Sequence, residues 1–346
     1  MTPEPPRTLR LSIDTAALAA NWRALDTLSG SASAGAAVKA NAYGVGVDQA
    51  VPALRNAGCR NFYVAHWSEV ADVVRHVPPE QVSVLHGPLT ADDVAFARAT
   101  GVRPVINSLV QARLWIESGG GACDLMVDTG INRLGISPSE VGDPVIAALQ
   151  VDTVMSHLAR SDEDHPFNAE QLRRASEAFA SVPAKRRSLA NSAGVALGSD
   201  YCFDVTRPGL SLFGGIQRPE LEGKIAQVVR PQAVVIQVRT LSRGDGVGYN
   251  SAFVADRTMR VGTVSLGYAD GILRCWGGGL AVQHEGRMLH LLGKISMDMI
   301  VVDLSDAPDM KEGDWLELPY NLPDASKASG LSQYELLTLL GVRFER

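Results

Sequence analysis

The chain has 346 residues, of which 46% are hydrophobic and 20% are charged, a composition typical of globular proteins with large cores. Its formal net charge of -6 argues against nucleic acid and against an anionic membrane surface as partners. No apolar run reaches the about 18 residues of a transmembrane helix, and the polar start MTPEPPRTLR lacks the apolar core of a signal peptide.

The cysteines are scattered along the chain and form no CxxC pair and no cluster at metal-ligand spacing (Cys59, Cys123, Cys202 and Cys275). In a chain of this length such cysteines are typical of reduced thiols in a cytoplasmic protein. We therefore expect a cytoplasmic location and no bound metal.

The first predicted strand is LRLSI at residues 9–13, where apolar and polar residues alternate, and a helix is expected to begin at Asp14 and Thr15. From about residue 35 to 215, short apolar runs alternate with helix-like stretches such as 91–100, 137–150 and 168–180. The apolar runs are 35–39, 62–65, 82–86, 102–106, 123–128, 152–157, 186–190 and 210–214. Eight such strands separated by helices predict a closed parallel sheet with helices outside, a TIM-like (β/α)8 barrel.

The pattern changes after about residue 222, where glycines rather than long helices separate the strand-like runs. These runs are 231–241, 260–268, 287–293 and 299–304, and the stretch 331–341 is helix-like. The strand at 9–13 can pair with either part of the chain. We predict an α/β fold with a barrel at residues 14–220, followed by a mainly β domain formed by residues 221–346 together with 1–13.

Polar residues follow the predicted barrel strands at their carboxyl ends, where barrel enzymes carry their chemistry. Lys39 ends the first run, Arg133 follows the fifth, His157 ends the sixth, and Arg207 precedes the eighth. A partly desolvated lysine has a lowered pKa and can form a Schiff base with an aldehyde. Backbone N–H groups in small-residue turns, here residues 191–194 and the region of Gly209, can hold a phosphate. A cofactor with both an aldehyde and a phosphate is pyridoxal phosphate. An arginine that donates to its ring nitrogen would leave that nitrogen unprotonated, and the ring would then be a weaker electron sink.

The predicted β-rich domain adds Tyr249 in DGVGYNSAF, Tyr268 in SLGYADG, and Met297 with Asp298 in GKISMDM. A tyrosine in a glycine-rich loop can donate a proton when a nearby cation lowers its pKa. It can equally be a packing residue at a turn. The residues around Tyr249 do not decide between these two interpretations.

These segments, taken together, resemble the alanine racemases, pyridoxal-phosphate enzymes of fold type III. The matching motifs run in the family's order and at similar spacings: AVKANAYGVG, DTGINRLG, SHLARSDE, ANSAG, RPGLSLFGG, VGYNSAF, LGYADG and GKISMDM. The resemblance covers about residues 9–340 and is strongest to alphaproteobacterial members. Several ordered motifs are far more specific than one short pattern.

The resemblance implies a role for each matching residue. Lys39 forms the internal aldimine and is one catalytic base, and Tyr249 of the partner subunit is the other. The cofactor-binding set is Lys39, Tyr43, His157, Asn191, Ser192, Arg207, Gly209 and Leu210. The substrate-side set is Arg133, Met297, Asp298 and Tyr268.

The implied activity is the interconversion of L- and D-alanine through a pyridoxal-phosphate aldimine, with one base on each face of the substrate. A homodimer with shared active sites follows, because one chain would carry only half of the catalytic residues. The alternatives that stay open are a broader-specificity or serine racemase of the same family, a fold-type III decarboxylase, and a non-catalytic carrier of pyridoxal phosphate. Arg207 argues against the decarboxylase, and the second domain argues against the carrier.

The sequence departs from the family in three places. Met126 replaces a lysine that many members carbamylate to hold the equivalent of Arg133, so we expect another group to hold that arginine. Phe213 replaces a frequent tyrosine, which we interpret as a packing change. The sequence also ends at GVRFER, short of where the family often has a tyrosine near the phosphate, so we expect phosphate binding to lose one hydrogen bond of about 1 kcal/mol.

Overall fold

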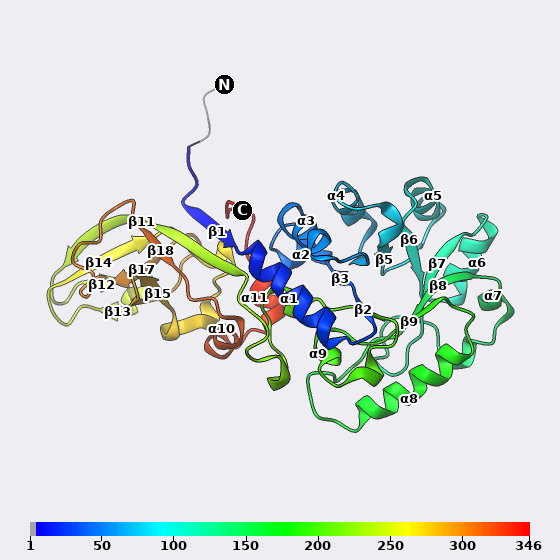
Figure 1. The fold of residues 1–346 in the computed structure, drawn as a ribbon. Helices are drawn as coiled ribbons and strands as arrows, with labels where there is room; N and C mark the ends of the chain where they lie inside the picture. The colour runs from blue at the N-terminus through cyan, green and yellow to red at the C-terminus, as the bar shows by residue number, and fades with distance from the viewer. Residues whose placement is uncertain (1–4) are drawn as a thin grey trace. The chain divides into compact units, whose positions relative to one another are not determined.

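The computed structural model describes residues 5–346 and divides them into two compact units (Figure 1). One unit comprises Thr15–Ala226, and the other combines the chain up to Asp14 with Gln227–Arg346. The predicted absence of a signal peptide and the assignment of residues 1–13 both include residues 1–4, which lie outside the described part. No helix in residues 5–346 has the length and apolar character needed to cross a membrane.

Within the described residues 15–226, seven parallel strands form one continuous sheet, in sequence order. These are β3 (Ala36–Ala37), β4 (Phe62–Val64), β5 (Val82–Val84), β6 (Arg103–Ile106), β7 (Ala122–Met126), β8 (Gln150–Met155) and β9 (Arg186–Ser188). Two further strands pair with each other in parallel, β2 (Ser33–Ala34) and β10 (Val205–Thr206). The predicted parallel barrel is therefore confirmed in its architecture, with β10 in the place of the eighth strand.

Backbone hydrogen bonds on both sides of β10 close the barrel. Gly35, between β2 and β3, donates its N–H to the carbonyl of Thr206 at 2.8 Å. Arg207 donates its N–H to the carbonyl of Ala190, just beyond β9, at 2.8 Å. A side chain at Gly35 would lie 2.9 Å from the carbonyl oxygen of Asn61, so only glycine allows the first strand to approach its neighbour so closely.

Helices connect the barrel strands, and local capping signals set their ends. Thr90 and Asp93 form a capping box at the start of α5, and Gly101 ends that helix in the left-handed conformation. The predicted helix at 91–100 is confirmed. The helices of this unit are α1 (Thr15–Leu28), α2 (Lys39–Tyr43), α3 (Val47–Ala57), α4 (Val70–Val74), α5 (Ala91–Thr100), α6 (Leu109–Glu117), α7 (Pro144–Ala147), α8 (Phe167–Ala180) and α9 (Ser192–Val195).

Two predicted elements of the barrel are wrong. The stretch 137–150 is not one helix but a 3₁₀ turn, Pro138–Glu140, and the short helix α7. Pro144 opens that helix because proline has no N–H to continue the preceding turn, and Asp143 caps it. The run 210–214 is not the eighth strand but a 3₁₀ helix, Leu210–Phe213, because the side chain of Ser192 binds the backbone N–H groups of Gly209 and Ser211.

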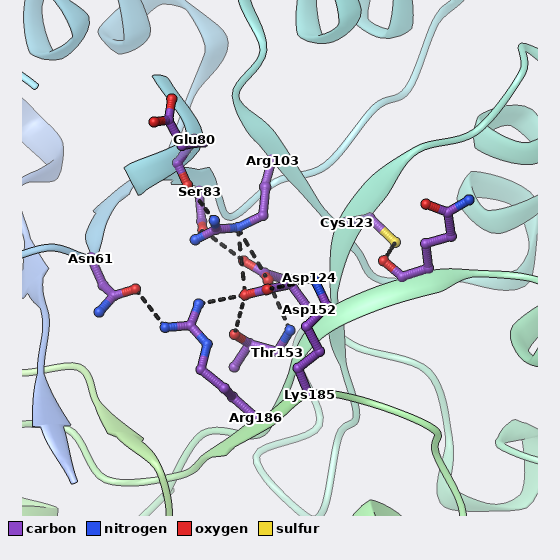
Figure 2. A network of polar contacts seen from close by, with 11 residues as sticks. Asn61, Glu80, Ser83, Arg103, Cys123, Asp124, Asp152, Thr153, Lys185 and Arg186 are labelled. Atoms are coloured by element: carbon purple, nitrogen blue, oxygen red, sulfur yellow. Dashed lines mark hydrogen bonds and ion pairs between the residues drawn. The ribbon is translucent and has the colours of Figure 1, made fainter. Parts of the chain in front are cut away.

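The amino ends of the barrel strands carry a buried network of charged side chains, shown in Figure 2. Asp124 is 1% exposed and accepts hydrogen bonds from Ser83 Oγ at 2.6 Å and from the Thr153 N–H at 3.1 Å. Arg103 Nε lies 3.5 Å from Asp124, and Arg186 pairs with Asp152. Burial raises the pKa of Asp124, whereas Arg103 and Ser83 favour its charged form. Each buried charge at this end of the barrel therefore has an opposite charge beside it.

The β-rich unit is built around the long strand β11 (Val229–Leu241), whose residues alternate between buried and more exposed positions before Gln237. The sheet order is β16-β15-β18-β11-β14-β17, and β1 (Leu9–Ile13) pairs with β11. The other members are β14 (Met259–Val264), β15 (Ala281–His284), β16 (Arg287–His290), β17 (Ile300–Asp303) and β18 (Trp315–Glu317). A separate hairpin joins β12 (Gly246–Val247) to β13 (Phe253–Val254), and α10 (Leu322–Ser329) and α11 (Gln333–Thr338) follow. The predicted mainly β fold of this part is confirmed.

The first prediction concerns the buried network. Asp124→Ala is expected to lower the free energy of unfolding by about 3–5 kcal/mol, because it removes the closest carboxylate from Arg103, whose side chain is only 12% exposed. Asp48→Ala is the matched control, since Asp48 pairs with Arg75 on the surface, and should cost less than about 1 kcal/mol. Urea unfolding followed by circular dichroism measures both. Equal losses in the two variants would contradict the assignment.

Candidate active site

Lys39 stands at the start of an unusual backbone turn. Ala40, Asn41, Ala42 and Tyr43 all have positive φ angles, between 52° and 55°, so the turn is left-handed. Each such residue other than glycine costs roughly 1–2 kcal/mol in a left-handed helical conformation. Strain of this kind persists only where the surroundings enforce it, and it is concentrated at functional sites.

Side chains hold this turn at both ends. Glu69 accepts hydrogen bonds from the N–H groups of Ala40 at 2.5 Å and of Ala65, just after β4, at 2.7 Å. The Asn41 side chain accepts from the N–H of Val47 at 3.0 Å. Glu69 is absent from the predicted set, because a single glutamate in a helical stretch gives no signal that it contacts a neighbouring strand end.

The environment of Lys39 favours its neutral amine. Burial lowers the pKa of Lys39, the positive charge of Arg133 lowers it further, and Glu69 opposes the shift. A neutral amine is the nucleophilic form that attacks an aldehyde and the basic form that accepts a proton. The positive charges of Lys39 and Arg133 therefore lie close enough to interact.

His157 follows β8 and is also kept neutral. Burial, together with the positive charges of Arg207, Arg133 and Lys39, lowers its pKa to about 3. The residues of four separate strand ends therefore act on one another at the carboxyl end of the barrel. The charged groups that lower the pKa of His157 are thus the ones that the sequence predicts at the same rim.

Arg207 brings a buried positive charge to this end of the barrel. The residue is 7% exposed and donates to Ser188 Oγ and to the carbonyl of Ser156. Within residues 5–346 it forms no ion pair with a carboxylate, and desolvation lowers its pKa. A buried guanidinium without a paired anion fits a site that receives an electron-rich ligand.

A cluster of small and hydroxyl-bearing residues lies beside these charges. Ser192 Oγ accepts from the N–H groups of Gly209 at 2.9 Å and Ser211 at 3.2 Å. The ring of Tyr43 stacks on Phe213 at 5.0 Å, and a side chain at Gly209 would lie 2.2 Å from the Tyr43 hydroxyl. Ser211 Oγ is buried without a hydrogen-bond partner among the described residues. Hydroxyl groups gathered in this way suit the oxygens of a phosphate.

Two further residues of the predicted set have structural partners. The Asn191 side chain accepts from the Gly194 N–H at 2.8 Å and from Ser161 Oγ at 3.0 Å, and so caps α9. Leu210 is buried, at the start of the 3₁₀ helix Leu210–Phe213. Both therefore lie next to the cluster of Ser192 and Gly209.

The position of Met126 changes how the Arg133 loop is held. Met126 is buried, and a side chain at Gly135 would lie 2.9 Å from its Cγ, so the methionine packs against the end of this loop. Asp128 instead organises the loop. One of its carboxylate oxygens accepts hydrogen bonds from the backbone N–H groups of residues 130–132, and the other accepts one from the N–H of Arg133 at 2.9 Å. The carboxylate holds the backbone of Arg133, and the Arg133 side chain itself is exposed.

Three of the four remaining predicted residues line one hollow within the β-rich unit. This hollow of ≈ 470 Å³ is lined by Tyr249, Met297 and Asp298, among other residues of the same unit. Tyr249 is 65% exposed and Met297 is 53% exposed. Tyr249 is therefore not a packing residue of its turn. Tyr268 does not line the hollow but adjoins it, because its N–H donates to the carbonyl of Ser296 at 3.0 Å.

Comparison with known proteins places these features in a family. The family profile described as alanine racemase, N-terminal domain, matches residues 13–217, and the profile for the C-terminal domain matches residues 228–346. The chain belongs to the alanine racemase family. It is 40% identical to an alanine racemase of Rhizobium meliloti, covering 97% of this chain and 96% of the relative. It is 41% identical to one of Cereibacter sphaeroides, covering 98% and 97%.

Solved structures of family members have the same fold. The alanine racemase of Bartonella henselae, whose crystal structure is described with covalently bound pyridoxal phosphate, aligns with a TM-score of 0.90 at 34% identity over 99% of both chains. The biosynthetic alanine racemase of Pseudomonas aeruginosa aligns with a TM-score of 0.88 at 31% identity, again over 99% of both chains.

The second prediction is that the His157 imidazole stays neutral at pH 5 in the folded protein. Among the seven histidines, the NMR signal that disappears in His157→Gln should not shift between pH 8 and pH 5. The same residue in urea-unfolded protein should titrate near pH 6.5, the unperturbed value. Because the unfolded state binds this proton first, the residue lowers the stability of the fold as pH falls from about 6.5 towards 3. A midpoint near 6.5 in the folded protein would contradict the prediction.

Proposed function

We propose that this chain is a pyridoxal-phosphate-dependent alanine racemase that interconverts L- and D-alanine. The observation that carries the proposal is that both family domains match in order across the chain, with Lys39, His157 and Arg207 together at the carboxyl end of the barrel. The relatives at about 40% identity are named alanine racemases, which favours alanine over the alternative of a serine or broader-specificity racemase.

The residues at this end of the barrel fit pyridoxal phosphate. Lys39 would bind its aldehyde carbon, and the cluster of Tyr43, Ser192, Gly209 and Leu210 would bind its phosphate. Arg207 would donate to the ring nitrogen, with His157 and Asn191 beside the ring. When bound, the cofactor stabilises negative charge at the substrate α-carbon. Because arginine stays protonated, Arg207 would keep the ring nitrogen unprotonated and so limit side reactions.

Two residues would move the α-proton. The neutral amine that burial favours at Lys39 would accept or deliver the proton on one face of the substrate. The Tyr249 side chain of the partner subunit would do so on the opposite face, delivering the proton as a phenol and accepting it as a phenolate. A single base would mostly return the proton to the face from which it came, so inversion requires both. Arg133, Met297, Asp298 and Tyr268 would position the substrate.

The proposed enzyme is a cytoplasmic homodimer in which each active site combines the barrel of one subunit with the β-rich unit of its partner. The high exposure of Tyr249 and Met297 around one hollow supports this arrangement, because large apolar groups exposed together are typical of interaction sites. The substrate would be a free amino acid.

The third prediction tests the two bases. Lys39→Ala should lose both racemisation and the covalent adduct with pyridoxal phosphate that borohydride traps for mass spectrometry. Tyr249→Phe should keep the adduct and lose about 10²–10⁴-fold in racemisation of L-alanine, measured by chiral chromatography. Tyr334→Phe, which alters another exposed tyrosine of the same unit, is the matched control and should be near wild type.

Mixing the two inactive variants tests whether the site is shared. In a mixed dimer one site would contain both Lys39 and Tyr249, so co-refolded variants should regain about a quarter of wild-type activity, since half of the dimers are mixed and one site in two is intact. No recovery, with mixed dimers demonstrated by mass spectrometry, would place both bases in one chain. Racemisation of L-serine that is faster than racemisation of L-alanine would favour the alternative of a serine racemase.

The fourth prediction concerns the phosphate cluster. Gly209→Ala should weaken binding of pyridoxal phosphate by at least about 10-fold, because the added methyl group would lie 2.2 Å from the Tyr43 hydroxyl. Gly142→Ala is the matched control, since its methyl group meets no atom of the described residues within 4 Å. Fluorescence titration of the cofactor-free protein measures both affinities. An unchanged affinity in Gly209→Ala would remove Gly209 from the cofactor site.

A further inference from the structure

Three segments far apart in the sequence meet inside the β-rich unit: residues 267–271, residues 296–298 and residues 339–343. The N–H groups of Tyr268 and Ala269 donate to the carbonyls of Ser296 and Met297, both at 3.0 Å. The N–H of Gly341 donates to the carbonyl of Asp270 at 3.3 Å. The two loops that carry Tyr268 and Met297 are therefore joined through their backbones.

Glycines make this close approach possible. A side chain at Gly267 would lie 2.3 Å from the carbonyl oxygen of Met297. Gly271 has a φ of +93°, and a side chain there would lie 2.3 Å from the carbonyl oxygen of Leu339. Contacts this short leave no room for a Cβ atom, so the junction depends on glycine at both positions.

One guanidinium links the carboxylates of both loops. Arg343 Nε donates to Asp270 Oδ1 at 2.7 Å, and the NH1 nitrogen of Arg343 donates to Asp298 Oδ1 at 2.6 Å. Asp270 is fully buried, and its other oxygen accepts the N–H of Gly267 at 2.9 Å. Asp298 is half exposed and lines the hollow beside Met297. Arg343 therefore connects a fixed internal carboxylate to one that faces the proposed substrate side.

The backbone around Arg343 is itself held by the sheet. Phe344 is 1% exposed, and Glu345 exchanges backbone hydrogen bonds with β1, donating to Leu9 at 3.0 Å and accepting from Leu11 at 2.7 Å. Because β1 pairs with β11, the guanidinium extends from a segment that is anchored to the central sheet.

We propose that Arg343 is a positioning residue that locks the Tyr268 loop to the Met297–Asp298 loop and so sets the affinity and selectivity for the amino-acid substrate. The inference rests on the proposed function. Its ion pair also offsets the negative charge of Asp298, which would otherwise repel a substrate carboxylate. Arginine suits this role because its planar fork can hold two carboxylates at once, which a single ammonium group does less well.

The test uses hydrogen–deuterium exchange and kinetics on the full-length holoenzyme. Arg343→Gln should increase exchange in peptides covering both residues 266–272 and residues 295–299. Asp298→Ala, which removes only the half-exposed partner, should increase exchange in 295–299 alone. Arg257→Gln is the matched control, because Arg257 pairs with Asp256 and Asp303 on the surface of the same unit and should change neither loop.

The kinetic measurement separates positioning from a general loss of structure. Arg343→Gln is expected to raise the KM for L-alanine by about 10-fold or more, with a smaller change in kcat. It should also lower the ratio of kcat/KM for L-alanine to kcat/KM for L-serine. Arg343→Lys should be intermediate in both quantities. If Arg343→Gln does not fold, Asp298→Ala carries the test through its selective effect on residues 295–299.

Two outcomes would overturn the proposal. One is deuterium exchange in the two loops that is the same in Arg343→Gln as in Arg257→Gln. The other is a KM and an alanine-to-serine preference that match that control. A wild-type protein that binds pyridoxal phosphate but racemises neither amino acid would instead refute the proposed function, and the exchange measurement would still decide whether Arg343 joins the two loops.

Discussion

The placement of positive charge inside the barrel is the constraint on which the candidate site depends. At the amino ends of the strands, Arg103 and Arg186 lie beside Asp124 and Asp152, so each buried charge is offset. At the carboxyl ends, Arg207 is buried without such a partner among the described residues. Burying an unpaired charge is costly, and the cost is tolerated where a ligand completes the site.

Positive charges also lower the pKa of two groups at this end of the barrel. The positive charge of Arg207 contributes to the low pKa of His157, and that of Arg133 contributes to the lowered pKa of Lys39. A lowered pKa favours the neutral amine, which is the form that acts as a nucleophile and as a base. The left-handed turn after Lys39 adds a second cost, which Glu69 offsets by binding the N–H of Ala40.

In the β-rich unit, exposed side chains stand in front of a buried carboxylate. Tyr249 and Met297 are exposed around one hollow, whereas Asp270, directly behind the Tyr268 turn, is fully buried. Arg343 spans the two environments by contacting Asp270 and Asp298. Loops that present side chains to a ligand lose less entropy on binding when their backbones are already fixed in this way.

The sequence by itself determined the features that arise from local patterns. Alternating apolar runs and helical stretches predicted the barrel and the mainly β part, and the capping residues Thr90 and Gly101 defined α5 because they act on their own neighbours. The ordered motifs also predicted roles for Lys39, Arg207 and Tyr249. Only the tertiary structure decided that residues 210–213 form a 3₁₀ helix, that Glu69 binds the turn after Lys39, and that Arg343 joins two loops. Each of these depends on a contact between residues distant in the sequence, where the energy of a long-range hydrogen bond or ion pair overrides the local preference of the chain.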